Sequence, residues 1–307
     1  MFKAVKNRKE IIKEVLNDLK LLQSNNSINQ YAVEENINFF KASKSIPTYL
    51  FWVIKKAPRV DGERLLEIND LLQKWDLAMH ERLIEIEKRT FPGLITPLVE
   101  KIANIILNTN NQITVMSFGC GGMEAERQII SSLIANKHDT RVVFIGVDRS
   151  LIIKQIIQKN LKNLEEQINF YEVENLTSER FAELRKKQTK KYLIILCKNN
   201  IFELEKCFQE EEIDILFHTL FKHHFIKEEK EKIDAIAKKL AKRVIEYDGY
   251  RSLHNMIPQT IIGWNNPIFL NAEIFSHLRF STKKELIEAH KKKVLFMKIG
   301  YYLLELK

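Results

Sequence analysis

The chain has 307 residues, 45% of them hydrophobic and 29% charged, which are the proportions of a globular protein rather than of a disordered or fibrous one. Its 9 Gly and 6 Pro form no biased tract, so no long linker is expected. The formal net charge of +9 suits an anionic partner. The basic residues are spread among 40 acidic ones, however, which favours a solvated basic surface instead.

The cysteines and the N-terminal segment indicate in which cellular compartment the protein is expected. Cys120, Cys197 and Cys207 are odd in number and show no Cys-x-x-Cys spacing, so neither a disulfide framework nor a metal site is expected. The N-terminal segment contains acidic residues and no long apolar run, which argues against a signal or transit peptide. The apolar run from Tyr49 to Ile54 is too short to span a bilayer. We expect a cytoplasmic protein without a membrane partner.

The first part of the chain is predicted to be helical. Apolar residues recur there at helical spacing, as in Ile11, Val15, Leu19 and Leu22, and again in Leu65, Ile68, Leu72 and Trp75. The Asn-rich connector 108–111 ends this pattern. We therefore predict an N-terminal helical region over residues 1–110, which forms either a cap over a pocket or the surface of a homodimer.

The remaining residues, 111–307, alternate between strands and helices. Five short apolar runs predict buried strands: Ile113–Phe118, Val142–Val147, Tyr192–Cys197, Ile213–Phe217 and Arg243–Tyr247. Helical segments between them indicate a parallel sheet covered on both faces. The last two runs, Val294–Lys298 and Tyr301–Leu306, are joined by two residues and must form an antiparallel hairpin. The prediction is a seven-stranded mixed α/β sheet whose last strand is antiparallel, with Ile168–Val173 as an insertion.

The first strand leads into a glycine-rich turn. Gly119-Cys120-Gly121-Gly122 follows Phe118 and precedes the helix that begins near Glu124. Glycines let the backbone approach a ligand closely, and the helix start offers free N–H donors. Asp148 ends the next strand, where a carboxylate can accept hydrogen bonds from both ribose hydroxyls of a nucleoside. The alternative for Asp148 is a helix N-cap.

Three features argue against a dinucleotide site. Glu124 stands at the third position of Gly-x-Gly-x-x-Gly, where its charge opposes a pyrophosphate. Gly121 and Asp148 are 27 residues apart, whereas that fingerprint places the acid roughly 20 residues on. An antiparallel closing hairpin is also foreign to an all-parallel dinucleotide sheet.

Residues 113–307 resemble the class I S-adenosylmethionine-dependent methyltransferases, which have a Rossmann-like fold. The resemblance rests on Gly119-Cys120-Gly121 with Phe118 before it, and on Asp148 in Gly-Val-Asp-Arg-Ser. It also rests on the segment 214–225, which ends in His-His-Phe as in many small-molecule members, and on the reversed last strand. It implies S-adenosylmethionine as cofactor. The cofactor-binding residues it implies are Phe118, Gly119, Cys120, Gly121, Glu124, Asp148, Arg149, Asn200 and His218.

The sequence departs from the family at two positions. Ser117 stands where the family has an acidic residue that holds the amino group of the methionine moiety, and Met123 replaces the third glycine. Glu124 or Glu126 can supply the missing charge.

Two residues are candidates for the contact with adenine. Asn200 lies 14 residues before Asp214, the usual spacing, whereas Glu174 has the usual chemistry but lies 40 residues before it. We favour Asn200.

In-line positioning of donor and acceptor supplies much of the acceleration in methyl transfer, and a general base is added when a hydroxyl must lose its proton. The predicted catalytic residues are His218, Tyr247 and His254. His218 follows a strand, at the edge where open α/β sheets place ligands.

The long connection 246–280 is predicted to be the substrate lid, because long loops in compact domains are often functional. Its proposed substrate-binding residues are Tyr250, Arg251 and Trp264. The resemblance thus implies methyl transfer to a small-molecule acceptor.

Two alternatives stay open. One is a nucleic-acid methyltransferase, which the charge encourages, although the chain lacks the Asn/Asp-Pro-Pro-Tyr string of base-amino methylating enzymes. The other is a catalytically inactive methyltransferase-fold subunit, which Ser117 and Met123 would support.

Overall fold

The chain forms two compact units. The first comprises Met1–Leu83, His223–Ile226 and Gly249–Ala289, and the second comprises Ile84–Lys222, Lys227–Asp248 and His290–Lys307. The computed structural model describes residues 7–23, 29–60, 93, 95–148, 153–250, 260, 264–265, 267, 270–271, 274–275, 278, 280–281, 283–290, 294–298 and 301–307.

Short helices build the first unit. They are α1 (Arg8–Leu22), α2 (Gln30–Ala42), α3 (Ile46–Lys55) and the 3-10 turn η1 (Ala57–Arg59). Asn7 and Glu10 form a capping box at the start of α1, and Ser45 caps α3. Phe39 is the centre of the core, because its ring contacts those of Phe40, Tyr49, Trp52 and Phe275 edge to face. Leu270, Ile274, Phe275 and Leu278 join the same core. The helical character predicted for this region is therefore confirmed in the residues described.

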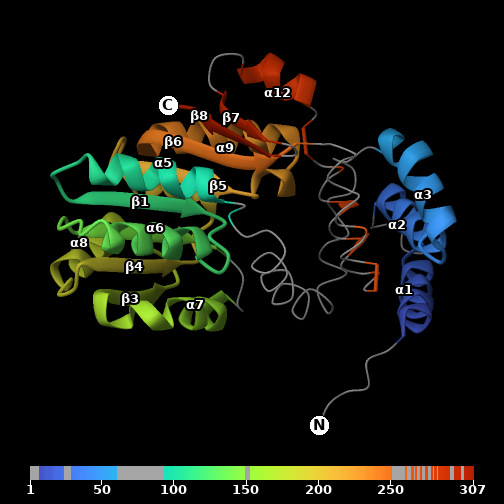
Figure 1. Ribbon diagram of the computed structural model, residues 1–307, viewed down its shortest axis with the longest axis horizontal. Helices are drawn as coiled ribbons and strands as arrows, with labels where there is room; N and C mark the ends of the chain where they lie inside the picture. Colours follow the sequence, from blue (N-terminus) through green and yellow to red (C-terminus); the bar gives the residue numbers. More distant parts are fainter. Residues whose placement is uncertain are drawn as a thin grey trace, which may run out of the picture. The chain divides into compact units, whose positions relative to one another are not determined.

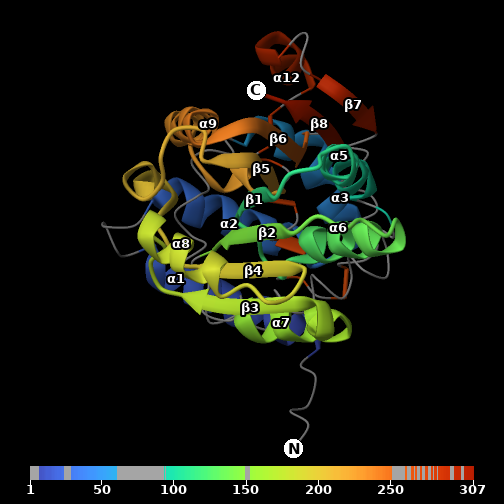
Figure 2. The same cartoon turned by 90° about the vertical axis from the view of Figure 1, so that its left-hand side faces the viewer.

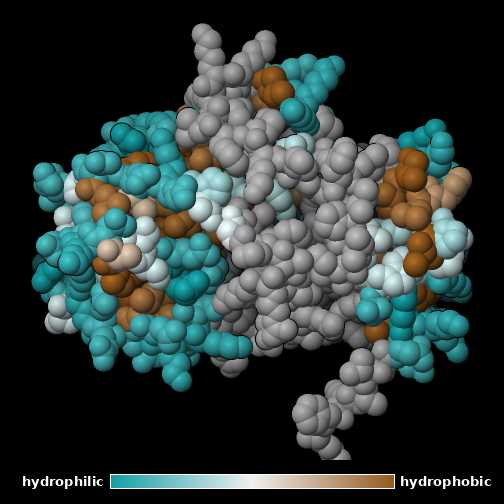
Figure 3. All heavy atoms as spheres, in the orientation of Figure 1, coloured by the Kyte–Doolittle hydropathy of each residue, from teal (hydrophilic) through white to brown (hydrophobic). Residues whose placement is uncertain are grey.

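One face of α3 is apolar and exposed. Ile46, Leu50, Phe51 and Ile54 are each between 43% and 60% exposed, although the helix buries Tyr49, Trp52 and Val53 on its other side. Brown, hydrophobic atoms gather over α3 in Figure 3. A helix that is apolar on both faces is suited to contact a further surface.

An eight-stranded sheet forms the second unit (Figure 1). The strands are β1 (Ile113–Phe118), β2 (Val142–Val147), β3 (Ile168–Val173), β4 (Tyr192–Cys197), β5 (Ile213–Thr219), β6 (Ala241–Gly249), β7 (Val294–Lys298) and β8 (Tyr301–Glu305). Their order is β3-β4-β2-β1-β5-β6-β8-β7. All six residues of β1, of β2 and of β4 are buried, because helices cover both faces of the sheet.

Helices lie on both faces of this sheet, as Figure 2 shows for α5 and α6 on one side and α8 and α9 on the other. The first face carries α5 (Thr96–Leu107), α6 (Glu124–Ala135) and α7 (Ile153–Leu161), whose apolar residues join one core cluster with the strands. The second carries α8 (Ser178–Lys186) and α9 (Lys227–Leu240). Short turns η3 (Lys162–Gln167), η4 (Ile201–Lys206) and η5 (Lys222–His224), and the helix α12 (Lys283–His290), complete the described elements.

The predicted sheet is confirmed, with one strand more than expected. The seven predicted strands are present, and β8 runs antiparallel to β7. The predicted insertion forms the eighth strand, β3, which pairs in parallel with the edge of β4. The protein therefore has a Rossmann-like α/β fold whose sheet closes with an antiparallel hairpin.

Two boundaries differ from the sequence prediction. The helix α5 precedes residue 110 but packs into the sheet core, because Leu98, Ile102 and Ile106 are fully buried there. The second compact unit therefore begins before the predicted boundary. The segment Gly249–Ala289, which includes most of the predicted lid, belongs to the first unit. None of the helices in the described part of the chain combines the length and the apolar character needed to cross a membrane.

Candidate functional site

The carboxyl ends of β1, β2 and β5 meet at the switch point of the sheet. The register places Phe118 of β1 between Val147 of β2 and His218 of β5. The residues that follow these strands therefore lie along one edge. In open α/β sheets this is the place where ligands bind, because successive connections leave the sheet on opposite faces there.

The loop after β1 is a tight turn held by backbone hydrogen bonds. Gly119 and Gly121 have φ angles of +62° and +48°, which glycine adopts without strain. The N–H groups of Gly119 and Cys120 both donate to the carbonyl of Val147, at 2.8 and 3.4 Å, so the loop crosses the end of β2. Among the described residues, a side chain at Gly121 would meet no atom within 4 Å, whereas one at Gly119 would collide with the ring of Phe221. The open approach to the loop is therefore at Gly121.

Met123 fits where the family has a third glycine. Its backbone is left-handed (φ +54°), and its side chain is fully buried. Gly146 in β2 makes this possible, because a Cβ there would lie 2.1 Å from Cε of Met123 and 2.8 Å from Sγ of Cys120. The side chain of Met123 therefore fills the space next to Gly146 of β2.

Asp148 follows β2 and is partly exposed. Its Oδ2 accepts a hydrogen bond of 3.0 Å from the N–H of Gly121. Its own N–H donates to the carbonyl of Cys197, at 3.0 Å. The carboxylate therefore lies beside the loop, as a ribose contact requires. The N-cap alternative concerns residues 149–152, including the predicted Arg149, which lie outside the described residues.

Ser117 and Glu126 form a buried pair beneath the loop. Ser117 and Glu126 are each 2% exposed. The Ser117 hydroxyl donates a hydrogen bond to Oε1 of Glu126. Burial raises the pKa of Glu126 to about 7, although the Ser117 bond opposes the shift; the carboxylates of Glu124 and Asp148 add to it. A carboxyl group thus lies next to the β1 position from which the family's acid is missing.

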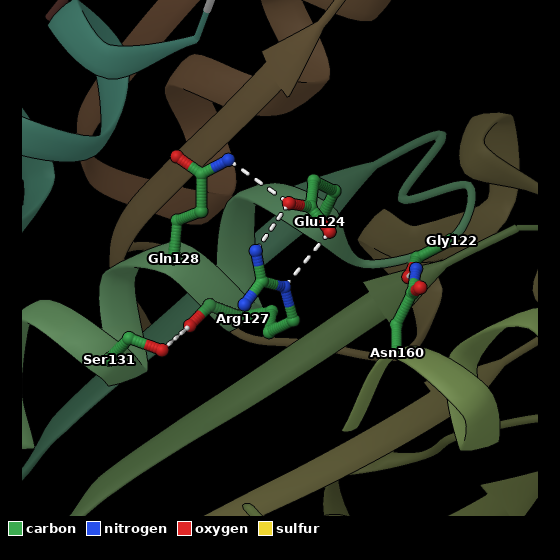
Figure 4. Close-up of polar contacts among 6 residues, drawn as sticks. All are labelled: Gly122, Glu124, Arg127, Gln128, Ser131 and Asn160. Atoms are coloured by element: carbon green, nitrogen blue, oxygen red, sulfur yellow. Dashed lines mark hydrogen bonds and ion pairs between the residues drawn. The ribbon is translucent and has the colours of Figure 1, made fainter. Parts of the chain in front are cut away.

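Glu124, the predicted cofactor contact, turns back along its own helix (Figure 4). Arg127 donates two hydrogen bonds to its carboxylate, of 3.0 and 2.6 Å, and Gln128 donates a third of 3.1 Å. In the same view Asn160 of α7 donates to the carbonyl of Gly122, at 2.7 Å, and so fixes the loop. Of the two carboxylates that the sequence leaves open, only that of Glu124 is engaged by an arginine among the described residues.

The residues after β4 lie next to Asp148, because β4 pairs with β2. Asn199 is buried and binds both backbone groups of Leu176. Asn200 caps η4 by accepting from the N–H of Phe202, at 3.2 Å. Glu174 follows β3, one strand further from β2, and pairs with Lys198. Topology therefore places Asn200 nearer to Asp148 in the sheet than Glu174.

His218, predicted to be catalytic and cofactor-binding, is fully buried. Burial lowers its pKa, and neither ring nitrogen has a hydrogen-bond partner among the described residues. Its Nε2 lies 3.9 Å from Oε2 of Glu246 on the neighbouring strand.

Lys222 joins this cluster as its cation. Its ammonium lies 2.8 Å from a carboxylate oxygen of Asp234 and 2.8 Å from one of Glu246. Burial opposes the charge of Glu246. Lys222, His218 and a hydrogen bond from Tyr302 together outweigh burial and lower the pKa of Glu246 to about 2. His218, Asp234 and Glu246 offer ligand atoms within 4.8 Å of one another. The lysine already lies between the two carboxylates, so the cluster is an ion-pair network.

The other predicted residues fall in different places. Tyr247 is buried in the sheet core, where its ring stacks on Tyr301 at 6.0 Å, and burial raises its pKa. Tyr250 is 9% exposed. Trp264 packs in the first unit, with Arg8 4.0 Å above its ring and Tyr49 beside it. Arg251 and His254 lie outside the described residues.

Sequence reasoning missed the roles of Gly146, Phe221 and Lys222. Gly146 carried a signal, since a glycine inside a buried strand often marks a close approach by another part of the chain. Lys222 carried none, because its partners Asp234 and Glu246 are 12 and 24 residues away.

No protein-family model matches the chain, and no curated protein matches its sequence. Solved structures do match. The CurJ carbon methyltransferase is 8% identical over 94% of this chain and 70% of its own, with a TM-score of 0.46. The plantazolicin methyltransferase BamL, solved with a substrate analog and SAH, is 12% identical over 92% and 74%, with a TM-score of 0.42. A SAM-dependent methyltransferase from Aquifex aeolicus is 11% identical over 72% and 95%, with a TM-score of 0.41.

Proposed function

We propose that this protein transfers the methyl group of S-adenosylmethionine to a small-molecule acceptor, a metabolite or a natural product. The observation that carries the proposal is the pairing of Gly121 with Asp148 at the switch point of the sheet. The loop is open at Gly121, and a carboxylate lies beside it. A nucleoside can lie over this loop with its ribose hydroxyls toward Asp148.

The charge around the loop supports a cationic donor. Glu126 and Asp148 carry carboxyl groups there, whereas the carboxylate of Glu124 is already paired with Arg127. An anionic pyrophosphate would be repelled by these groups, whereas a sulfonium and an ammonium would be attracted. The site therefore fits S-adenosylmethionine better than a dinucleotide.

When bound, the cofactor supplies an activated methyl group. The chain's own task is to hold donor and acceptor in line and to accept a proton if the acceptor is a hydroxyl. His218 and Tyr247 are both buried in this structure. Among the three predicted catalytic residues, the proposal therefore favours His254 as the base that meets the acceptor, with Tyr250, Arg251 and Trp264 as substrate contacts.

Two contacts favour an active enzyme over the alternative of an inactive fold, which rests on Ser117 and Met123. Met123 packs against Gly146, and the Ser117 hydroxyl donates to the carboxyl group of Glu126. The nucleic-acid alternative rests on the net charge of +9.

Two further features support the proposed setting. The three cysteines are free thiols, as a reducing cytoplasm would keep them.

The exposed apolar face of α3 supports a homodimer as one role for the helical region.

Two measurements test the proposal. Calorimetry should show that the purified protein binds S-adenosylhomocysteine, and absence of binding would favour the inactive fold. Labelled S-adenosylmethionine should then be offered with lysate fractions, with and without nuclease treatment. Transfer to a nuclease-resistant small molecule is expected. Label lost after nuclease treatment would instead identify a nucleic-acid acceptor.

A further inference from the structure

We infer that Glu126 binds the α-ammonium group of the methyl donor, in place of an acidic residue on β1. The inference rests on the proposed function, because it takes the donor to be S-adenosylmethionine. The residue that makes this contact lies on the helix α6, and Ser117 orients its carboxylate.

The geometry starts from the face of β1 on which Ser117 lies. Side chains alternate along a strand, so Ser117 shares its face with Ile113 and Val115. Both belong to the core cluster that includes α6. Glu126 lies in the first turn of α6, and its carboxylate accepts the hydrogen bond from Ser117. The helix residue thus brings its carboxyl group to the strand position, from above the sheet.

Among the described residues, no cation compensates the carboxyl group of Glu126. None of the ion pairs among the described residues involves it, and its side-chain partner is the neutral hydroxyl of Ser117. The neighbouring groups Glu124 and Asp148 are acidic as well. A buried carboxylate without a cation is costly to keep charged, and the cost falls when a cation binds.

The α-ammonium of the donor meets this need. It is a compact cation with three hydrogen-bond donors, and a carboxylate has oxygens to accept them. The donor would approach the loop at Gly121, where the space is open, with its ribose held at Asp148. Glu126, in the first turn of α6, would then hold the amino-acid end of the donor.

The matched control is Glu124, which lies in the same helical turn. Its carboxylate is engaged by Arg127 and Gln128 and faces away along the helix. Glu124→Gln and Glu126→Gln remove the same charge from positions two residues apart. If Glu126 contacts the donor, Glu126→Gln should lower the affinity strongly and Glu124→Gln only slightly. If local negative charge is all that matters, the two variants should lower the affinity to a similar extent.

The experiment measures the affinities of two ligands by calorimetry at pH 8. S-adenosylhomocysteine carries the α-ammonium, and 5′-methylthioadenosine lacks the amino-acid part. Glu126→Gln should lower the affinity for S-adenosylhomocysteine by about one to two decades, because a charge-assisted hydrogen bond is lost. The affinity for 5′-methylthioadenosine should stay unchanged. The double variant Ser117→Asp/Glu126→Gln, which returns the carboxylate to β1, should recover most of the loss.

Each other outcome has a definite meaning. If Glu126→Gln lowers the affinity for both ligands equally, or lowers neither, the inference is overturned and the proposed function stays intact. Equal effects of Glu124→Gln and Glu126→Gln would also overturn it. Failure of the unaltered protein to bind either ligand would overturn the proposed function and the inference together.

Discussion

The N–H of Gly121 donates a hydrogen bond of 3.0 Å to Oδ2 of Asp148, and this bond joins the loop after β1 to the end of β2. Asp148 therefore has two tasks under the proposal, because it holds the loop and also accepts the ribose hydroxyls. Substitutions at this position can separate them.

Asp148→Ala should lower the affinity for S-adenosylhomocysteine by about one to two decades, since charge-assisted hydrogen bonds worth roughly 1.5–3 kcal/mol are lost. It should also lower the free energy of unfolding by about 1 kcal/mol, because Gly121 loses its acceptor. Asp148→Asn is the control, since its carbonyl can still accept from Gly121 while the charge is gone. Calorimetry and a thermal melt measure both. Affinity that stays unchanged in folded Asp148→Ala would contradict the site.

Gly146→Ala should destabilise the protein by about 1–3 kcal/mol, because the new methyl group collides with Met123 and Cys120. The same change combined with Met123→Gly should cost less than the sum of the two single variants, since the collision partner is removed. Denaturant unfolding of the four proteins gives the coupling energy. Additive effects would mean that Met123 does not lie on Gly146.

Lys222→Met should destabilise the protein by about 3–5 kcal/mol, because it leaves the carboxylates of Asp234 and Glu246 buried without a cation. Lys242→Met is the matched control. Its ammonium also lies 2.8 Å from a carboxylate, that of Asp214, but its side chain is 56% exposed. An exposed pair contributes about 0–1 kcal/mol, so the control should unfold nearly as the parent does.

The stability of the protein should depend on pH through Glu126. Its pKa is about 7 in the folded state, above the ordinary value of 4.5, so the folded protein holds the proton more tightly. The protonated carboxyl group of Glu126 therefore contributes to the free energy of unfolding. This contribution, up to about 3 kcal/mol, is fully present below pH 4.5 and is lost as pH rises to about 7. Glu126→Gln should therefore melt at a higher temperature than the parent at pH 8. A lower melting temperature would indicate a purely structural role.

The same group should make binding depend on pH. The groups that act on Glu126 are the hydroxyl of Ser117 and the carboxylates of Glu124 and Asp148, and it acts in turn on the thiol of Cys120. A bound ammonium favours the ionised form, so the affinity for S-adenosylhomocysteine should rise as pH increases through 7 and then level off. In Glu126→Gln this rise should be absent, which calorimetry from pH 6 to 8 can check.

Much of the fold was predictable from local pattern. Short apolar runs of five to seven residues bury both faces of a strand, and two residues between Val294–Lys298 and Tyr301–Glu305 allow only an antiparallel hairpin. The positions of Gly119, Gly121 and Asp148 followed from the same pattern, because parallel strands bring their carboxyl ends to one edge. These features depend on residues near one another in sequence.

The tertiary structure decided what the departures from the pattern mean. Ser117 and Met123 depart from the family pattern, and each contacts a residue on another element: Ser117 donates to Glu126 on α6, and Met123 packs against Gly146 on β2. It also placed His218 against Glu246 and Lys222, a neighbourhood set by the pairing of β5 with β6. Packing and charge compensation act through space, between side chains that the chain brings together only when it folds.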